Sequence, residues 1–397
     1  MSRLAELRHR PPMRPDGRLT DLYAVATLAL IPLSAALHLV LPPRFSYDSD
    51  TLQRIAAGEY TPLEDTSYLY VGRIYSHLGM ADRPWAAMVL GLALAALALY
   101  PAMVRARGTA SLPVYALVGL YVLTASVYLG QYSKDIWAVP VILVVLLAGH
   151  GWRGELAIVA TTVVYASFLR SYWFLILAVY LGLRVLTASA LLRRRVLLGV
   201  AGVLAGVTLL SPALLGTDIQ SVRTSVNLDR ALSADAATAI SSMQLPGGVV
   251  GDVVENAVTF VELVVPLPLL AQGSPVYGAY FLGIALIWGM YARATFVGPG
   301  RLFDGRPAAA ADLRSVRAAL FALAVVVTQG FFEPDYGSYL RHLTPVMPLV
   351  LAVTVGRAGS LFLGPPPPAP AGPAAPDGLP DLTPSSERGT PPGGAHA

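Results

Sequence analysis

Charged and aromatic side chains lie beside apolar segments in four short stretches of this chain. One stretch contains Lys134, the only lysine of the sequence, which is followed directly by Asp135. Two others contain Arg170 and Arg341. Cations in such places suit an anionic ligand such as a phosphate, because an ammonium group supplies a mobile charge and a guanidinium donates two parallel hydrogen bonds. The alternative interpretation is that the three cations only pair with nearby carboxylates, which are those of Asp135, Glu333 or Asp335.

In the second stretch, Arg170 is followed by Ser171, Tyr172 and Trp173. A guanidinium beside two aromatic rings suits bidentate phosphate binding, with a sugar or an isoprenoid chain stacked on a ring. The same pattern is also typical of an aromatic belt at a membrane surface, with an arginine that extends to the water. Both interpretations remain open at this point.

The third stretch places Glu333, Asp335, Arg341 and His342 within ten residues at the start of an apolar segment. His342 is expected to carry protons near neutral pH. Arg341 is expected to begin a helix, where the helix dipole favours an anionic ligand beside it. The structural alternative is an ion pair between Arg341 and Glu333 that closes the loop.

The fourth stretch holds Asp48 and Asp50, directly after the first apolar segment. Two such carboxylates suit a general base for a hydroxyl group, or a site for a divalent cation such as Mg²⁺ or Mn²⁺. Alternatively, the aspartates only cap a short helix that begins near Leu52. The remaining candidates for substrate binding are Arg73, Glu255 and Glu262.

The composition predicts an all-α, polytopic membrane protein. Hydrophobic residues make up 55% of the 397 residues and charged residues only 13%, about half of the usual share in soluble domains. The net charge of +4 reflects arginines at the ends of apolar segments, so nucleic acid is not an expected partner. The sequence contains no cysteine, which excludes disulfides and thiolate chemistry. It also contains no P-loop, GxSxG or HExxH motif.

Arginine-rich and arginine-poor turns alternate along the chain, which predicts about ten transmembrane helices with both termini in the cytoplasm. The triplet Arg193-Arg194-Arg195 is the strongest orientation marker. With this orientation, the four stretches described above all face the outer side. The predicted spans are 21–41, 85–104, 112–130, 136–148, 155–169, 173–192, 196–215, 277–291, 317–330 and 340–355.

The segment 252–272 does not fit this alternation as a full span. Asp252, Glu255, Thr259 and Glu262 lie on one arc at helical spacing, opposite apolar residues. We therefore expect an amphipathic or re-entrant helix on the outer side, with its acidic arc toward an acceptor groove.

Three regions follow from these predictions. Residues 1–20 form a basic cytoplasmic N-terminus, and residues 21–362 form the transmembrane domain. Residues 363–397 are rich in Pro, Gly and Ala, which predicts a disordered cytoplasmic tail. The expected outer loops are 42–84, 216–251 and 331–340.

Four segments of the chain together resemble those of Wzy/EpsG-type polysaccharide polymerases of bacteria. They are the loop after the first span, the turn Ser133-Lys134-Asp135, the exit Arg170-Ser171-Tyr172-Trp173 and the entry 337–342. That resemblance implies joining of undecaprenyl-diphosphate-linked repeat units at the outer face of the cytoplasmic membrane. An acidic residue in the first outer loop also resembles GT-C glycosyltransferases, which take single sugars from a polyprenyl phosphate, and Asp48 or Asp50 would fill that role.

Both resemblances imply one arrangement of roles. Arg170, Arg341 and Lys134 would neutralise the lipid phosphate or diphosphate as it leaves. Asp48 or Asp50 would deprotonate the acceptor hydroxyl, and the further candidates for that role are Glu333, Asp335 and His342. The implied partners are membrane lipid, a polyprenyl-linked glycan and other polysaccharide-assembly proteins. The non-enzymatic alternatives are a lipid or glycan transporter and a structural subunit of an envelope complex.

Overall fold

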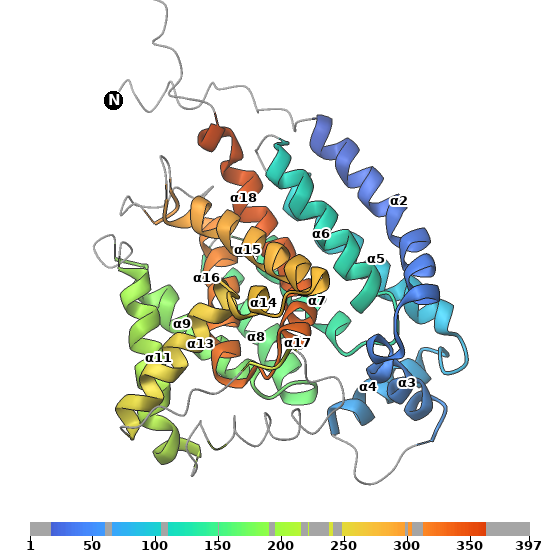
Figure 1. Cartoon of the computed structure of the whole chain (residues 1–397), viewed down its shortest axis with the longest axis horizontal. Helices are drawn as coiled ribbons and strands as arrows, with labels where there is room; N and C mark the ends of the chain where they lie inside the picture. Colours follow the sequence, from blue (N-terminus) through green and yellow to red (C-terminus); the bar gives the residue numbers. More distant parts are fainter. Residues whose placement is uncertain are drawn as a thin grey trace, which may run out of the picture. The chain divides into compact units, whose positions relative to one another are not determined.

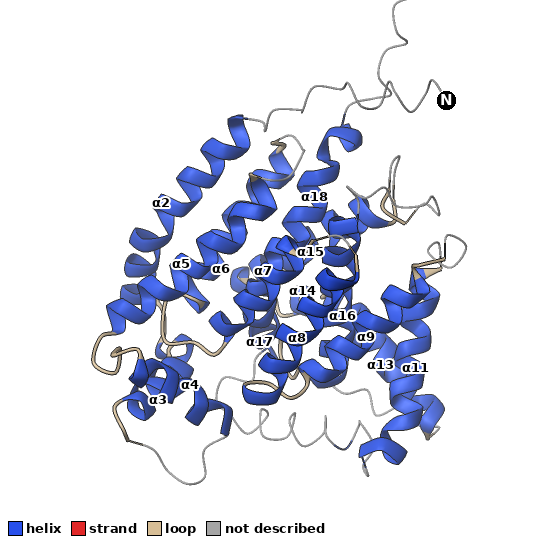
Figure 2. Cartoon of the chain, turned by 180° about the vertical axis from the view of Figure 1, so that it is seen from behind, coloured by secondary structure: helices blue, strands red, loops and turns tan. Residues whose placement is uncertain are grey.

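The structure is a computed structural model, and it describes residues 17–59, 66–104, 110–149, 151–189, 195–215, 221, 238–240, 248–297, 301–303 and 313–362. The elements named within these ranges are α-helices and short 3₁₀ helices, with no strand (Figures 1 and 2). All of these residues belong to one compact unit, Met1–Phe362. The basic N-terminus up to residue 16, most of the predicted loop 216–251 and the predicted tail 363–397 lie outside the described residues.

Most of the apolar segments form helices close to the predicted bounds. The helices are α2 (Gly17–Val40), α5 (Pro84–Met103), α6 (Leu112–Tyr128), α7 (Val139–Leu147), α8 (Trp152–Phe168), α9 (Trp173–Leu186), α11 (Val196–Leu215), α13 (Val249–Val264), α15 (Pro275–Thr295), α16 (Leu313–Phe332) and α18 (Met347–Phe362). The shorter elements are η1 (Pro43–Phe45), α3 (Tyr47–Ala56), α4 (Thr66–His77), η2 (Asp135–Ala138), α14 (Pro268–Ala271), α17 (Tyr336–Leu343) and η5 (Thr344–Val346).

Five of these helices are long and apolar enough to cross a membrane, namely α2, α5, α11, α15 and α16. The apolar segments of α6, α7 with η2, and α9 are shorter. These lengths and compositions are those of a helical membrane protein. The predicted total of about ten spans goes beyond what these five helices establish.

Helix α16 is the central helix of the described bundle. Within its most apolar window, 89% of the residues are buried, and it packs against α9, α18, α13 and α7. Between Ala318 and Val327 its sequence is apolar on all sides, which is the pattern of a helix surrounded by other helices. In contrast, only 17% of the corresponding window of α2 is buried, so α2 lies at the periphery of the described residues.

A buried arginine joins one end of α16 to α7, α8 and α9. The Arg317 side chain is fully buried, and its guanidinium donates to the carbonyls of Ala148, Gly149 and Gly151 between α7 and α8, at 2.7–3.2 Å. Its Nε also lies 3.0 Å from Glu155 Oε1. These bonds pair carbonyl groups that lie after the end of α7 and at the N-cap of α8. Arg184, in the last turn of α9, pairs with the same carboxylate at 2.9 Å.

This arrangement fixes which turns lie at the opposite end of the same helices. Because α8 begins and α9 and α7 end near Arg317, the turns that precede α7, join α8 to α9 and follow α16 lie away from it. Those turns contain Asp135, Arg170 and Glu333. Their shared end agrees with the predicted alternation of turns along the chain.

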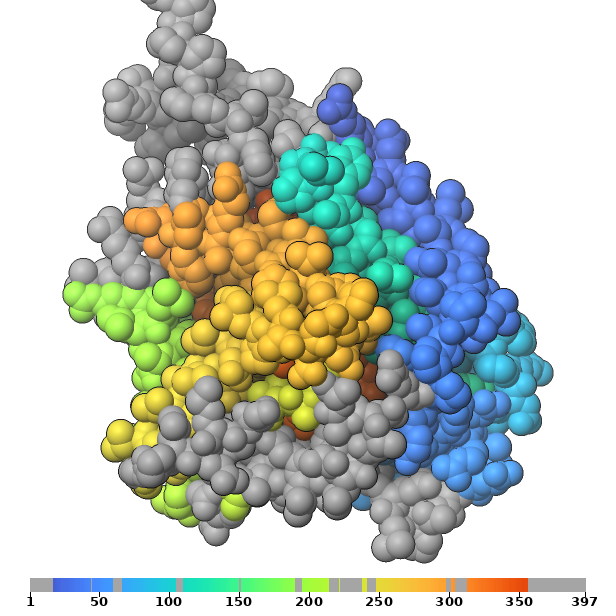
Figure 3. Space-filling model, viewed as in Figure 1, coloured from blue at the N-terminus to red at the C-terminus, as the bar shows by residue number. Residues whose placement is uncertain are grey.

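Helix α13 has its polar residues on the side that packs against other helices. Glu255, Asn256 and Thr259 are buried against α11 and α16, and Asn256 donates to Thr208 Oγ1 of α11 at 2.8 Å. The exposed side of the helix is apolar and carries Val250, Val254, Val261 and Val265. A helix on a membrane surface has its polar side toward water. In α13 the polar side faces the other helices and the apolar side is exposed, which is not the arrangement of a helix on a membrane surface. The re-entrant alternative and the acceptor groove stay predictions. Figure 3 shows α13, α14 and α15 covering one face of the molecule.

The last predicted span is divided. A short helix, α17, precedes η5 and α18, so Arg341 and His342 lie in the last turn of α17 and not at the beginning of α18. The helix dipole favours cations at that end. Helices α3 and α4, which occupy the predicted loop 42–84, lie at the same end of the bundle as α17 in both views (Figures 1 and 2).

Candidate functional site

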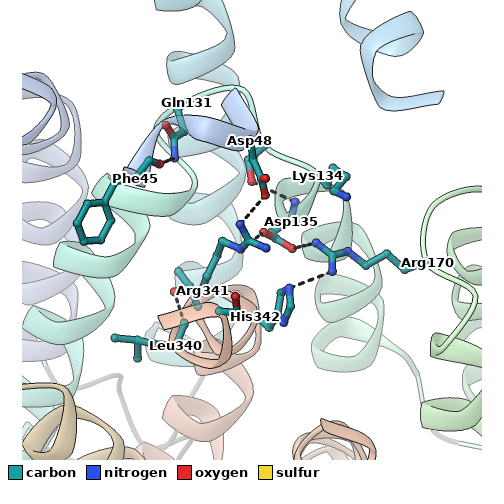
Figure 4. Close-up of polar contacts among 12 residues, drawn as sticks. Phe45, Asp48, Gln131, Lys134, Asp135, Arg170, Leu340, Arg341 and His342 are labelled. Atoms are coloured by element: carbon teal, nitrogen blue, oxygen red, sulfur yellow. Dashed lines mark hydrogen bonds and ion pairs between the residues drawn. The ribbon is translucent and has the colours of Figure 1, made fainter. Parts of the chain in front are cut away.

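Five charged residues from separate parts of the sequence meet at one end of the bundle (Figure 4). We call them the charged cluster, and its members are Asp48 of α3, Lys134 and Asp135 at η2, Arg170 between α8 and α9, and Arg341 of α17. The three cations singled out in the sequence thus lie together with two carboxylates. The alternation of acids and bases explains how they share a small volume.

Helix α4 holds the lysine turn in place. Tyr75, which is fully buried, donates its hydroxyl to Ser133 O and accepts from Ser133 N, both at 3.1 Å. Tyr132, in the same turn, donates to the carbonyl of Met80 just after α4. Gly72 allows α4 to approach α3 closely, because a Cβ at that position would lie 2.4 Å from the Ile55 side chain. The loop 42–84 is therefore packed onto the turn that carries Lys134 and Asp135.

Asp48 and Arg341 form the outermost ion pair of the charged cluster. Arg341 Nη1 lies 2.5 Å from Asp48 Oδ2, and Tyr68 donates its hydroxyl to Asp48 Oδ1 at 2.6 Å. Burial alone would raise the pKa of Asp48, but Arg341, the Tyr68 hydroxyl and Lys134 together hold this pKa below its ordinary value. In this arrangement Asp48 is an ionised, weakly basic carboxylate.

Asp135 joins the two arginines. Its Oδ1 lies 2.6 Å from Arg170 Nη2, and its Oδ2 lies 3.4 Å from Arg341 Nε. Burial would raise the pKa of Asp135, but Arg170 and then Arg341 lower it to about 2. Asp135 therefore remains charged, which allows two guanidinium groups to lie close together.

Arg170 also contacts the residues that follow α8 and those of α17. Its Nη1 donates to Tyr172 Oη at 3.2 Å and lies 3.0 Å from His342 Nε2. His342 Nδ1 in turn lies 2.9 Å from Glu333 Oε2. The predicted alternative, an ion pair between Arg341 and Glu333, is not formed, because Glu333 pairs with His342 and Arg341 pairs with Asp48.

The ammonium group of Lys134 lies 3.3 Å from the centre of the Tyr68 ring, and it donates to Ser67 Oγ at 3.4 Å. A cation above an aromatic face is stabilised by the ring quadrupole. Tyr68 thus contacts both an anion, through its hydroxyl, and a cation, through its ring.

A cavity of about 730 Å³ lies on one side of the charged cluster. We call it the larger cavity. Its wall includes the charged residues Asp48, Asp50, Asp335 and Arg341. Its aromatic wall consists of Phe45, Tyr47, Tyr128, Tyr277 and Tyr280. Aromatic faces beside carboxylates suit a polar ligand with apolar faces, such as a sugar ring.

A second pocket, of about 250 Å³, lies at Arg170 and Lys134. We call it the smaller pocket. Besides these two cations it is lined by hydroxyl groups, which come from Thr66, Ser67, Ser167, Ser171, Tyr70 and Tyr172. Two cations and several hydroxyl donors suit a compact anion with several oxygen atoms.

The rim of the smaller pocket continues into an exposed apolar face. Phe168 lines the pocket and is 55% exposed, and its ring packs edge-on against Tyr70. Leu156, Val163 and Val164 are exposed on the same side of α8. Helix α8 runs along this face to the smaller pocket. The arrangement therefore suits a ligand with an anionic head in the pocket and a long apolar chain along α8.

Two of the predicted site residues have structural partners that account for them. Asp335 caps α17, since it accepts from the amide and the hydroxyl of Ser338, each at 2.9 Å. Trp173 is buried and packs against Tyr165 and Phe321, so its ring is a core ring and offers no stacking surface in this structure.

The other predicted residues are distributed over the surface and the core. Asp50 is exposed in the wall of the larger cavity and accepts from the Ser46 hydroxyl at 3.2 Å. Both aspartates lie in the first turn of α3, whose N-cap is Ser46, so they do not cap a helix that begins at Leu52. Arg73 is exposed on α4 and forms no ion pair with another described residue. Glu255 and Glu262 lie on α13, outside the two pockets as described.

The sequence analysis did not single out several residues of the site. Tyr68, Tyr128 and Tyr280 lie on helices whose aromatic residues look like ordinary packing residues in a sequence. Only Tyr68 could have been noticed in the sequence, because it begins the amphipathic face of the helix that lies inside the first outer loop. Tyr128 and Tyr280 enter the site through the packing of α6 against α15.

The aspartates do not fit a divalent cation in this arrangement. Arg341 and Tyr68 occupy the two oxygens of Asp48, and the Arg341 guanidinium lies where a second cation would be repelled. No group of three or more potential metal ligands occurs among the described residues.

No family model, curated protein or solved structure matches the chain. Its function must therefore be argued from the charged cluster, the two pockets and the apolar helices.

Proposed function

We propose that the chain is a membrane glycosyltransferase that uses a sugar or an oligosaccharide repeat unit carried on a polyprenyl phosphate or diphosphate, for assembly of a surface polysaccharide. The proposal places the reaction at the outer face of the bacterial cytoplasmic membrane. The observation that carries it is the position of the charged cluster between two different pockets. One pocket has the lining expected for a phosphate and the other has the lining expected for sugars.

The lipid-linked donor places its phosphate in the smaller pocket, where Lys134 and Arg170 neutralise its charge. Its isoprenoid chain lies along the exposed face of α8 that ends at Phe168. The sugars occupy the larger cavity, between its aromatic wall and the carboxylates. Arg341 reaches the larger cavity and contacts Asp135, so it lies between the phosphate and the sugars of the donor.

In the reaction, a hydroxyl oxygen of the acceptor attacks the anomeric carbon of the donor sugar. The bond from that carbon to the phosphate oxygen breaks, and the phosphate leaves with the electron pair. Asp48 accepts the proton of the hydroxyl, or Asp50 does so from the same cavity wall. Asp48 becomes a stronger base when the phosphate attracts Arg341 away from it, because Arg341 holds its pKa low.

The arrangement also supports an alternative donor. A GT-C-type enzyme would add single sugars from a polyprenyl monophosphate and would use the same two pockets. A polymerase would use a diphosphate-linked oligosaccharide. The volume of the larger cavity accommodates more than one sugar ring, which favours the polymerase.

A second candidate function, transport of a lipid or glycan, rests on a different observation. Buried polar residues lie between α11, α13 and α16, among them Asn256, Thr259 and Gln329. Polar side chains inside a membrane domain are typical of substrate paths. The ionised pairs, however, lie at the two ends of the helices and not along this seam, which favours the enzyme.

The test uses the purified full chain in liposomes with lipid extract of the producing strain. Lipid-linked glycans are followed by gel electrophoresis and mass spectrometry. We expect a ladder of repeat units with the wild type, and loss of the ladder with Arg341→Ala. The matched control is Arg153→Ala, which removes an exposed arginine at the opposite end of α8.

Each outcome decides between the candidates. A single added sugar in place of a ladder supports the GT-C-type reaction. Glycans that change sides of the liposome without any covalent change support transport and overturn the proposal. Equal products from wild type and Arg341→Ala overturn the assignment of the charged cluster as the active site.

A further inference from the structure

His342 lies in the last turn of α17, between a carboxylate and a guanidinium. Its Nδ1 lies 2.9 Å from Glu333 Oε2, and its Nε2 lies 3.0 Å from Arg170 Nη1. The side chains of Glu333 and Arg170 are largely buried, with 3% and 10% of their areas exposed. His342 lines neither of the two pockets as described, so it has no direct access to a ligand there.

The chemistry of the two neighbours determines which ring nitrogen carries the proton. An arginine guanidinium only donates hydrogen bonds, so His342 Nε2 must accept from Arg170. A neutral imidazole has one donor and one acceptor nitrogen, so Nδ1 carries the hydrogen and donates to Glu333. The contacts therefore require a neutral His342 in the Nδ1–H form.

We infer that His342 is a positioning residue that holds Arg170 toward the smaller pocket only while its imidazole is neutral. Protonation of Nε2 would place two N–H groups and two positive charges against each other at 3.0 Å. Arg170 would then lose one of its contacts and shift relative to Asp135 and Tyr172. Binding of an anion beside Arg170 thus depends on pH through a residue that the anion does not touch.

The other charged groups around His342 act in known directions. Glu333 and Asp135 favour a protonated imidazole, whereas Arg170 and the neighbouring Arg341 oppose it. Helices α6 and α15 also pack against α17, and the titratable groups that they present to the adjoining cavity are the phenols of Tyr128, Tyr277 and Tyr280. These phenols are neutral in the pH range concerned.

This inference assigns to His342 a role other than the proton carrier expected from the sequence. It rests on the proposed function in one respect, which is that the smaller pocket binds the phosphate of a lipid. The experiment therefore measures binding of a polyprenyl phosphate to the purified full chain in detergent, with the corresponding polyprenol as the ligand that lacks the phosphate. No turnover is needed.

Binding is compared between about pH 8 and about pH 5, the range across which imidazole side chains usually titrate. We expect the wild type to lose about tenfold in affinity toward the acid end, which corresponds to about 1.4 kcal/mol. His342→Gln should lose clearly less affinity than the wild type, because its amide oxygen can accept from Arg170 and does not titrate. Only the loss from the second ionisation of the ligand phosphate, whose pKa is about 6, should remain in this variant. His77→Gln, which changes an exposed histidine of α4, should retain the wild-type loss.

Glu333→Gln supplies a second variant that remains informative if His342→Gln does not fold. Removing the carboxylate takes away a charge that favours the protonated imidazole, so the loss of affinity should move to lower pH. A purely structural role of His342 would weaken binding equally at all pH values.

The outcomes separate the inference from the proposed function. Phosphate-dependent binding with the same acid loss in wild type and His342→Gln overturns the inference and leaves the proposed function intact. A polyprenyl phosphate that binds no better than the polyprenol at any pH overturns the proposed function itself, and the inference with it.

Discussion

Arg170 lies 2.6 Å from Asp135, and this ion pair is more completely buried than the others of the charged cluster. Only 10% of the Arg170 side chain and 6% of the Asp135 side chain are exposed. The pair joins the turn between α8 and α9 to the turn before α7. Asp135 also contacts Arg341. Removal of the Asp135 carboxylate therefore leaves the positive charges of two guanidinium groups less neutralised.

Asp135→Asn is therefore expected to destabilise the protein strongly. Removing one partner of a buried ion pair typically costs about 3–5 kcal/mol, because the other charge stays buried. Thermal unfolding of the purified chain in detergent measures the effect. Asp50→Asn, which changes an exposed aspartate, should unfold close to the wild-type temperature. Similar unfolding temperatures for Asp135→Asn and Asp50→Asn would show that Arg170 has another adequate partner.

The pKa of Asp135 also predicts how stability depends on pH. Its value of about 2 in the folded chain lies below its ordinary value of 3.8, so the folded state favours the charged carboxylate. The corresponding stabilisation of about 2 kcal/mol is fully present above about pH 4 and is lost as the pH falls through about 2. Asp48, whose pKa is also lowered, adds a loss of the same sign.

Unfolding temperatures measured from about pH 6 down to about pH 2.5 test this dependence. The wild type should become less stable toward the acid end, and Asp135→Asn should show a smaller loss because it has no proton to bind there. An equal slope in both proteins would contradict the lowered pKa of Asp135.

The helices themselves were largely predictable from the sequence. Apolar runs that end at arginines, such as the run before Arg105, give the bounds of a helix such as α5 within about one residue. The division of the last segment into α17 and α18 was not predicted. Pro345 and Pro348 lie near the break, but the apolar run around them is otherwise continuous and looks like one span. What the polar side of α13 contacts was not predictable, since spacing shows that polar residues share one side but not whether that side meets water or other helices.

The site was predictable only in its strongest charges. Lys134, Arg170 and Arg341 stood out because cations are rare beside apolar segments. Their pairing was not predictable, because Arg341 bonds to Asp48 from the other end of the chain and not to the nearby Glu333. Long-range contacts of this kind follow from helix packing, which a single sequence does not specify.

The close approach of α5 to the end of α6 predicts a sensitive glycine. A Cβ on Gly91 would lie 1.9 Å from the carbonyl oxygen of Leu129, which is backbone and cannot rotate away. Gly91→Ala should therefore destabilise the chain by about 1–3 kcal/mol, as expected for overpacking. Gly119→Ala in α6 is the matched control, because no atom lies within 4 Å of its added Cβ. That variant should be neutral or slightly stabilising, since alanine favours a helix over glycine by about 1 kcal/mol. Equal unfolding temperatures for the two variants would contradict the close contact.

Tyr68 offers a test of Asp48 as the base. Its hydroxyl donates to Asp48 at 2.6 Å and is one of the groups that lower the pKa of this carboxylate, while its ring lies below Lys134. Tyr68→Phe keeps the ring and removes the hydroxyl, so the pKa of Asp48 should rise. If Asp48 accepts the proton of the sugar hydroxyl, the acid limb of the transfer rate should move to higher pH by about half a unit to one unit, as expected for the loss of one hydrogen bond to a partly exposed carboxylate.

The matched control for Tyr68→Phe is Tyr115→Phe, which removes an exposed hydroxyl from α6. Initial rates in the liposome assay, measured over a series of pH values, give both profiles. A shifted acid limb in Tyr68→Phe alone assigns the proton to Asp48, because no other candidate base accepts a hydrogen bond from Tyr68 among the described residues. Superimposable profiles for the two variants would instead assign the proton transfer to another carboxylate of the cavity wall, which is Asp50 or Asp335.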